Sequence, residues 1–429
     1  MFNTLKTRIA SKQAKIAVIG LGYVGLPLAI SFAQKGFKVF GIDTNPKHIE
    51  RLNQGESYIT DVRGKDFSKF IQSESFVVST EFGILHEADA VIICVPTPIK
   101  RKYTPDVSYM LSAIRSVAKH LHQGMLIVLE STTYPGTTEE LIQPELEKSG
   151  LKVGRDFHLA FSPERIDPGN KNFDVTQIPK VVGGITAGCT ELTTLLYGQV
   201  IKHVHPVSSA KAAEMTKLLE NSFRIVNIGW INEIAQTCHK MGIDVWEVIE
   251  AAKTKPFGFM PFYPGLGVGG HCIPEDPLYL YWKAKRYGVN SKFIKLAADT
   301  NAHMPNYVIH RIEASLSKPL SKCKILVVGV TYKKDVKDLR KSPSIRLVEL
   351  LKHQSQVDYY DPLVPFLKVG GIDLNSVALD SKSVKSYDCV VMAVDHTAVN
   401  YDLIRKNARR IFDVRNIYKN FKDSKIERL

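Results

Sequence analysis

The sequence places one cysteine, Cys272, between a glycine-rich loop and a predicted helix. The loop runs Pro264-Gly265-Leu266-Gly267-Val268-Gly269-Gly270, which gives the backbone unusual freedom. Asp276-Pro277 then predicts a helix start, because proline at the first helical position gives up no N–H that the helix needs. A thiol beside a helix N-terminus tends toward thiolate, the nucleophilic form of cysteine. A lone cysteine is more often a small buried apolar residue, so the rest of the chain has to decide between these interpretations.

A lysine and an amide form a second candidate pair on a predicted helix. Lys217 and Asn221 are four residues apart, so their side chains lie on one helix face. An ammonium and an amide side by side can stabilise a developing alkoxide, although an ordinary solvated helix face has the same spacing. Asp276, four residues after Cys272, fits a helix cap as well as a role in moving protons.

The first 43 residues follow the order strand, glycine turn, helix, strand, acid. Strands are predicted at 15–19 and 38–42, and a helical run at 26–35 lies between them. The turn GLGYVG would bring a pyrophosphate to the helix N-terminus, and the acid would bind the ribose hydroxyls. The acid would also repel the 2′-phosphate of NADP, which favours NAD. The candidate cofactor residues in this part are Gly20, Gly22, Tyr23, Val24, Gly25 and Asp43.

The elements that must position these residues form three regions. Strands predicted at 90–95, 126–129, 158–161 and 180–182 extend the first region as a doubly wound parallel sheet to about residue 206. A helix follows at 208–241, and shorter helices are predicted at 244–252, 276–287 and 291–315. The α/β alternation returns with strands at 324–328, 357–360, 387–394 and 410–414, and Ser342-Pro343 opens a helix. We therefore expect an α/β fold with two Rossmann-like doubly wound domains, joined by a helical domain with a long central helix.

Composition excludes some classes of protein and leaves others open. The chain has 429 residues and six scattered cysteines without a CxxC pair, which indicates neither a zinc site nor a disulfide framework and fits a reducing cytoplasm. No apolar run is long enough to span a bilayer, and the basic first 15 residues are expected to be a short surface extension. The net charge of +14 is consistent with nucleic acid, with a polyanionic small ligand, or with solubility alone.

Seven separated motifs give the chain a family resemblance from about residue 15 to 418. They are GLGYVG, CVPTP at 94–98, ESTTYPG at 130–136, SPER at 162–165, EMTKLLEN at 214–221, GVGGHCIPEDP and YKKDVKDLRKSP. Together, in this order, they resemble the UDP-glucose/UDP-mannose dehydrogenase family of nucleotide-sugar dehydrogenases. The resemblance implies an NAD-binding domain at 1–206, a central helical domain with the cysteine loop at 207–318, and a UDP-sugar-binding domain at 319–429.

The resemblance also implies a reaction. Family members oxidise the C6 alcohol of a UDP-sugar to a carboxylate with two NAD molecules in turn, and a cysteine carries a thiohemiacetal and then a thioester. Lys217 would act on the C6 oxygen with help from Asn221, and Glu164 would activate the water that cleaves the thioester. The implied catalytic residues are Cys272, Lys217, Asn221, Asp276, Glu164 and Thr132.

The binding residues follow from the same resemblance. Further NAD contacts are implied for Pro96, Thr97, Glu130, Thr132 and Arg340. The implied substrate contacts are Glu164, Arg165, Lys217, Asn221, Tyr263, Gly265, Gly267, Tyr332 and Lys333, with Lys211 and Arg415 as further candidates. No metal is implied, because the histidines lack ligand spacing.

The segment KPFGFMPFYPGLGVGGHC at 255–272 is similar to the branch of the family that acts on UDP-N-acetylhexosamines, UDP-N-acetylglucosamine above all. The galactosamine, mannosamine and unmodified glucose nucleotides remain alternatives. We expect a cytoplasmic homodimer that supplies polysaccharide precursors and binds neither nucleic acid nor membrane. The competing hypotheses are a non-catalytic nucleotide-binding protein and a one-step hydroxyacid dehydrogenase, which would not need Cys272.

Overall fold

The computed structural model describes residues 1–59, 62–100, 104–165 and 176–429. It divides into two compact units: Met1–Glu220 with Trp282–Tyr287, and Asn221–Tyr281 with Gly288–Leu429. Two helices, α8 (Ala210–Met241) and α10 (Cys272–Arg286), contribute residues to both units. The division into three domains at 206/207 and 318/319 stays a prediction.

The first unit is built on a sheet in the strand order β3-β2-β1-β4-β5-β6-β7-β8. Neighbouring strands from β3 to β6 run parallel, so their carboxyl ends share one edge. The strands are β1 (Lys15–Ile19), β2 (Lys38–Ile42), β3 (Phe76–Ser79), β4 (Ala90–Ile93), β5 (Leu126–Leu129), β6 (His158–Phe161), β7 (Lys180–Gly184) and β8 (Val204–Pro206).

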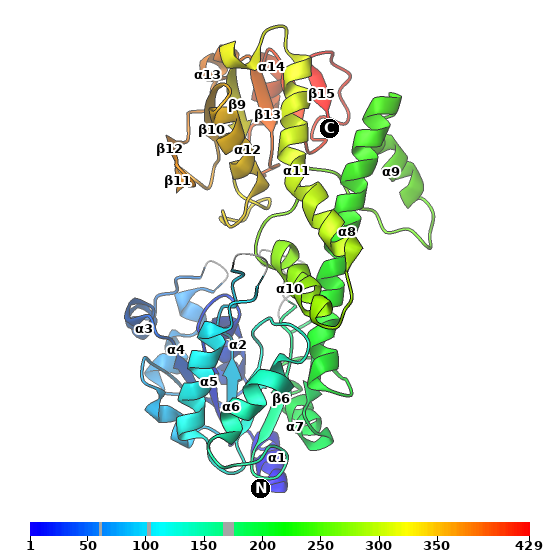
Figure 1. The fold of residues 1–429 in the computed structure, drawn as a ribbon. Coiled ribbons are helices and arrows are strands. Elements are labelled where there is room, and N and C mark those ends of the chain that lie inside the picture. The colour runs from blue at the N-terminus through cyan, green and yellow to red at the C-terminus, as the bar shows by residue number, and fades with distance from the viewer. Residues whose placement is uncertain (60–61, 101–103, 166–175) are drawn as a thin grey trace. The chain divides into compact units, whose positions relative to one another are not determined.

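Helices cover both faces of this sheet (Figure 1). Alternate strand residues point to opposite faces: Ile16 and Val18 pack with α2 and α7, whereas Ala17 and Ile19 share a core with α5 and α6. The helices are α1 (Phe2–Ala10), α2 (Gly25–Gln34), α3 (Pro46–Asn53), α4 (Ser68–Gln72), α5 (Ser108–His120), α6 (Gln143–Glu147) and α7 (Ala187–Tyr197).

The direction of β7 and the structure of the N-terminal segment differ from the sequence prediction. β7 runs antiparallel to β6; a strand buried on both faces has the same apolar pattern in either direction, so its pattern could not reveal this. The N-terminal segment forms α1, which packs beside α7 instead of remaining a surface extension. Phe2, Leu5 and Ile9 recur at helical spacing among the basic residues, and Leu5 and Ile9 are buried.

The second unit contains a parallel sheet in the order β10-β9-β13-β14-β15. α11 (Lys292–Ser315) and α12 (Pro343–Lys352) share one core with this sheet, and α13 (Ser381–Ser386) and α14 (Tyr401–Asn407) share the other. The strands are β9 (Lys324–Val328), β10 (Gln356–Tyr360), β13 (Cys389–Met392), β14 (Ile411–Asp413) and β15 (Ile426–Arg428), with an antiparallel hairpin of β11 (Phe366–Val369) and β12 (Ile372–Asn375).

The remaining helices include the long central helix and the helix that begins at the cysteine. α8 is a single helix of 32 residues, as predicted, and α9 (Val245–Lys253) is capped by the Asp244 side chain. α10 begins at Cys272, four residues before the predicted start at Asp276. The proline of its first turn is Pro274, whose missing N–H costs nothing because the first helical N–H groups have no acceptor within the helix. Asp276 is therefore not a helix cap.

In the ranges that the structure describes, no helix combines the length and apolar character that crossing a membrane requires.

Candidate active site

The carboxyl edge of the first sheet collects the predicted cofactor residues. Gly20, Asp43 and Thr97 follow β1, β2 and β4, and Glu130 and Glu164 follow β5 and β6. The strand order reverses direction between β1 and β4, which is where open α/β sheets bind ligands.

The glycine turn fits the pyrophosphate of a dinucleotide. Gly20 has a φ of +90°, and a Cβ there would lie 2.7 Å from the Cys94 carbonyl oxygen. A Cβ at Gly25 would lie 1.9 Å from the Gly20 oxygen, so the helix can start this close to the strand only without a side chain. A Cβ at Gly22 would meet no atom within 4 Å, which leaves room on the outer side of the turn.

Asp43 closes the same turn from the second strand. Its Oδ2 accepts the Leu21 N–H at 3.0 Å and its Oδ1 accepts the Asn45 N–H at 2.9 Å. Each carboxylate oxygen has a second lone pair, so the half-buried side chain retains acceptors for ribose hydroxyls. Tyr23 and Val24 lie in the turn, with Tyr23 exposed, and these residues together would hold NAD.

A loop after β5 is fastened to α8 at two points. Lys217 Nζ donates to Thr132 Oγ1 at 2.5 Å, and the Thr132 carbonyl accepts from the hydroxyl of buried Thr97 at 2.6 Å. Three residues before Lys217, buried Glu214 accepts the Thr138 N–H at 2.9 Å and the Thr138 hydroxyl at 2.7 Å, and also bonds the Gly136 N–H. The loop that carries Thr132 is therefore ordered by helix α8.

Glu164 belongs to a buried cluster of charged groups. Lys180 Nζ donates to Glu164 Oε2 at 2.8 Å and also bonds Glu130, and the Tyr197 hydroxyl donates to Glu130 at 2.6 Å. The side chains of Glu130 and Lys180 are 0% and 6% exposed, so two carboxylates share one ammonium almost without water. The carboxylate of Glu130 is thus turned into this cluster.

Burial and the shared lysine push the two carboxyl pKa values apart. Burial raises the pKa of Glu130 to about 7, against the attraction of Lys180. Burial alone would raise the pKa of Glu164 too, but the Lys180 ammonium lowers it to about 2. Glu164 is therefore held ionised, and the pair takes up its next proton mainly at Glu130.

The cysteine in the second unit is accessible. Cys272 is exposed and is the first residue of α10, and the partial positive charge at a helix N-terminus favours the thiolate form of a cysteine. One turn further along α10, buried Asp276 accepts from Asn221 Nδ2 at 2.7 Å through its Oδ2. His271 Nε2 lies 3.1 Å from the Glu275 carboxylate of the same helix.

The glycine loop before Cys272 is pinned by two buried asparagines. Asn232 Oδ1 of α8 accepts the Gly265 N–H at 2.9 Å, and its Nδ2 donates to Asn301 Oδ1 of α11 at 2.9 Å. Gly267 has a φ of +110°, and a Cβ there would lie 2.4 Å from the Asn301 carbonyl oxygen. The hydroxyl of Tyr263 donates to Glu250 of α9 at 2.7 Å.

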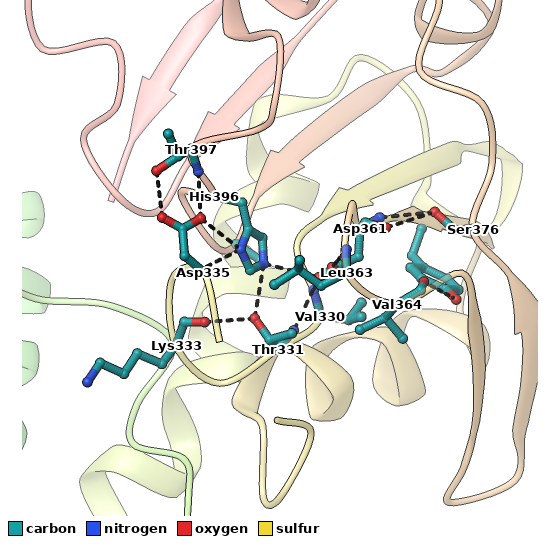
Figure 2. Close-up of polar contacts among 12 residues, drawn as sticks. Val330, Thr331, Lys333, Asp335, Asp361, Leu363, Val364, Ser376, His396 and Thr397 are labelled. Carbon is teal, nitrogen blue, oxygen red and sulfur yellow. Dashed lines mark hydrogen bonds and ion pairs between the residues drawn. The ribbon is translucent and has the colours of Figure 1, made fainter. Parts of the chain in front are cut away.

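The turn after β9 lies against the cysteine loop. The Gly270 N–H donates to the Arg340 carbonyl at 2.9 Å, and a Cβ at Gly269 would lie 2.6 Å from the Tyr332 Cβ. The Arg340 guanidinium bonds the Asp338 carboxylate at 2.6 Å. A polar network beneath this turn, shown in Figure 2, links it to His396 and Asp361.

The predicted site residues thus form separate groups. The first unit holds Thr132 with Lys217, and Glu164 with Lys180; the second holds Asn221 with Asp276 near Cys272. Arg165 pairs with Glu220, 2.9 Å away, and Lys211 with Glu139, 2.8 Å away. The convergence of these groups on one substrate stays a prediction.

Three residues of these polar clusters were not predicted from the sequence: Lys180, Tyr197 and His396. Lys180 heads a strand of wholly apolar neighbours, and a lysine in such a strand requires a buried carboxylate partner. His396 follows a buried strand at the ligand edge of the second sheet, which was an available signal. Tyr197 ends a helix and offered no comparable signal.

Family models match three consecutive parts of the chain. The NAD binding domain of the UDP-glucose/GDP-mannose dehydrogenase family matches residues 14–201, its central domain matches 211–303, and its UDP binding domain matches 326–420. The mannose nucleotide in the name of this family is GDP-mannose, which corrects the UDP-mannose expected from the sequence.

Individual proteins match over nearly the same length. The chain is 38% identical to UDP-N-acetyl-D-glucosamine 6-dehydrogenase of Pseudomonas aeruginosa, over 90% of the chain and 91% of the relative. It is 36% identical to UDP-N-acetyl-D-mannosamine dehydrogenase of Pyrococcus horikoshii, over 94% and 96%. The solved structure of UDP-D-ManNAc dehydrogenase from Pyrococcus horikoshii superposes with a TM-score of 0.86 at 35% identity, covering 95% of this chain and 96% of that one.

Proposed function

The chain belongs to the UDP-glucose/GDP-mannose dehydrogenase family of NAD-dependent nucleotide-sugar oxidoreductases, and on this premise we propose that it oxidises the C6 hydroxyl of UDP-N-acetylglucosamine to a carboxylate. The observation that carries the proposal is the exposed Cys272 at the first residue of α10, beside the hydrogen-bonded pair Asn221 and Asp276. An accessible thiol at a helix N-terminus suits a reaction whose intermediate aldehyde must be retained between two oxidations.

Cys272 would carry the sugar through the second half of the reaction. Its sulfur adds to the C6 aldehyde, a C–S bond forms, and the carbonyl oxygen takes a proton to give a thiohemiacetal. Loss of a hydride and that proton leaves a thioester. Water then adds at C6, the C–S bond breaks, and the acid and the free thiol are released. NAD, when bound at the glycine turn and Asp43, supplies the hydride acceptor.

The other predicted catalytic residues would handle the protons. Lys217, which is hydrogen-bonded to Thr132, would stabilise the oxygen anion at C6. Glu164 stays ionised beside Lys180 and would orient and activate the attacking water. Asp276, fixed by Asn221, would orient water or Lys217.

The named relatives support two candidate sugars for the substrate of this chain. The relative with 38% identity is a UDP-N-acetyl-D-glucosamine enzyme, and the one with 36% identity is a UDP-N-acetyl-D-mannosamine enzyme. These sugars differ only in configuration at C2. We take the glucosamine nucleotide as the substrate and the mannosamine nucleotide as the second candidate.

We also propose a cytoplasmic homodimer. Phe223 and Trp230 lie seven residues apart on one face of α8 and are 46% and 55% exposed, and Phe293 and Leu296 of α11 are 77% and 59% exposed. Exposed apolar side chains of this number favour a second copy as their cover. All six cysteines are free thiols, which fits a reducing compartment.

The decisive experiment is a substrate panel with the purified chain. We expect two NADH per UDP-N-acetylglucosamine and a higher kcat/KM for it than for the mannosamine, galactosamine and glucose nucleotides. A higher kcat/KM for the mannosamine nucleotide would establish the second candidate instead. No NADH from any UDP-hexose would refute the proposal.

The variants Cys272→Ser and Cys272→Ala test the thiol. We expect both to lose formation of the acid, because neither can form the thioester. If Cys272→Ser released the product at the wild-type rate, the reaction would be a one-step oxidation without a cysteine intermediate.

A further inference from the structure

Three loops of the second unit meet at one edge of its sheet, and one of them is the turn Thr331–Asp335. This turn follows β9, Asp361 follows β10, and His396 lies shortly after β13; these neighbouring strands are parallel, so their carboxyl ends share one edge. The side chains of Asp361 and His396 are 0% exposed, and Thr331 is also fully buried. Burying such polar groups is costly unless each finds a partner.

His396 has a partner on each ring nitrogen. The Asp335 N–H donates to Nδ1 at 3.0 Å, so Nδ1 must carry a lone pair. Nε2 lies 3.0 Å from Thr331 Oγ1 and 3.2 Å from Asp361 Oδ2. The Thr331 hydroxyl gives its own proton to the Lys333 carbonyl at 2.9 Å, so Nε2 must be the donor in its contacts. These bonds agree on one neutral tautomer with the proton on Nε2.

Asp361 and Thr397 complete the hold on the turn. Asp361 Oδ2 accepts the Val330 N–H at 2.7 Å, and Oδ1 accepts the Leu363 N–H at 2.8 Å. The Thr397 N–H donates to the Asp335 carboxylate at 2.8 Å and its hydroxyl donates at 2.5 Å. Asp335 has a φ of +55°, a conformation that residues other than glycine keep only when their surroundings fix it.

The fixed turn presents the two residues predicted to contact the substrate. The Lys333 side chain extends away from the network in Figure 2, while its carbonyl faces Thr331. Tyr332 packs under the cysteine loop, where a Cβ at Gly270 would lie 3.0 Å from its ring. A change in the turn would therefore move both Lys333 and the support of the loop that leads to Cys272.

We propose that His396, oriented by Asp361, is a positioning residue that holds the turn Thr331–Asp335 in the conformation that binds the UDP part of the substrate. This inference rests on the proposed function, in which Tyr332 and Lys333 contact the UDP-sugar.

Two amide variants separate the two bonds of His396. His396→Asn keeps an acceptor near Nδ1 for the Asp335 N–H but loses the donor toward Asp361. His396→Gln keeps a donor near Nε2 but loses that acceptor. Thr397→Val removes one bond to Asp335 at an exposed position, so it tests the turn without disturbing the buried core.

The measurements are the affinity of the full chain for UDP by calorimetry, the steady-state constants, and the melting temperature. We expect both His396 variants to bind UDP about tenfold more weakly, as the loss of a buried hydrogen bond implies, and Thr397→Val a few-fold more weakly. The KM for the UDP-sugar should rise in parallel, while the KM for NAD stays within about twofold of wild type.

The controls separate this inference from its premise. Tyr387→Phe removes a hydrogen bond of 2.8 Å to Asp358 elsewhere in the same sheet domain, and should leave UDP affinity unchanged. Lys333→Ala should weaken UDP binding. If it does so while the His396 and Thr397 variants bind UDP like wild type, the positioning role is wrong. If Lys333→Ala itself binds UDP like wild type, the substrate role of the turn is wrong, and the inference falls with it.

Discussion

The ammonium of Lys180 lies 2.8 Å from the carboxylate of Glu164, inside a pocket of protein that excludes nearly all water. Breaking this pair should cost more stability than breaking an exposed salt bridge, because the groups are buried and Glu130 shares the same ammonium. The first predictions concern what happens when this sharing is broken.

Removing the lysine would leave two buried carboxylates without a counter-charge. We expect Lys180→Met to lower the free energy of unfolding by about 3–5 kcal/mol at pH 8, as for other buried ion pairs that lose one partner. Urea unfolding measures this change. Lys180→Arg, which keeps the charge, should lose less. A Lys180→Met protein as stable as wild type at pH 8 would show that the carboxylates do not depend on the lysine.

Glu130 should give stability a pH dependence of unusual sign. Because burial raises its pKa to about 7, the folded protein keeps a proton that the unfolded chain releases above about pH 4.3. The stabilisation from this proton is fully present below about pH 4.3 and is lost as the pH rises through 7, by at most about 4 kcal/mol.

The variant Glu130→Gln isolates this contribution, because an amide does not titrate. The free energy of unfolding of Glu130→Gln minus that of wild type should increase between pH 5 and pH 8. Tyr197→Phe, which keeps the carboxyl group, should retain the wild-type slope. If the free energy of unfolding changed with pH by the same amount in wild type and in Glu130→Gln, Glu130 would not hold the proton.

The glycine turn predicts different effects on stability for two alanine substitutions. Gly22→Ala should fold with an unchanged melting temperature, because a Cβ there meets no atom within 4 Å. It should nevertheless weaken NAD binding at least about tenfold, since the methyl group would occupy the space where the pyrophosphate approaches the backbone. Calorimetry with NAD measures this loss.

Gly25→Ala is the matched comparison, because its Cβ would lie 1.9 Å from the Gly20 oxygen. This variant should lower the melting temperature as well as NAD affinity. Normal NAD binding by a folded Gly22→Ala protein would place the pyrophosphate elsewhere.

Lys217 and Thr132 should depend on each other in catalysis. Lys217→Ala removes both the ammonium and the anchor of the Thr132 hydroxyl, so we expect kcat to fall by about 10²–10³-fold, the range for loss of an anion-stabilising donor. Thr132→Ser keeps the hydroxyl, so its kcat should stay near that of wild type. The kcat of Thr132→Val should lie between those of wild type and Lys217→Ala. The double variant Lys217→Ala/Thr132→Val should be no slower than Lys217→Ala alone. Additive losses would show that the two residues act independently.

Much of the framework could be predicted from sequence because local patterns determine it. The predicted bounds of β1, β2, β5, β6 and β9 coincide with those in the structure, since each is a short apolar run bounded by turn residues. The start of the long helix α8 was predicted to within two residues, because its apolar residues recur at helical spacing. The start of α10 was wrong because two prolines are close together, and sequence alone could not tell which one occupies the first turn.

The side-chain clusters could be predicted only in part. Lys217 and Asn221 were identified by their spacing on one helix, which is a local property. Lys180 is 50 residues from Glu130, and His396 is 35 residues from Asp361, so their pairing depends on strand order in the sheet. The direction of β7 is likewise set by its neighbours and not by its own residues.

The close fit between Gly269-Gly270 and Tyr332 has a consequence for building chimaeras of these enzymes. The loop and the turn lie on opposite sides of the predicted boundary at 318/319, yet a Cβ at Gly269 would collide with Tyr332 at 2.6 Å. A crossover at that boundary would join a loop from one parent to a turn from another. Residues 264–343 should therefore be transplanted as one cassette, with crossovers outside it, when sugar preference is exchanged between relatives.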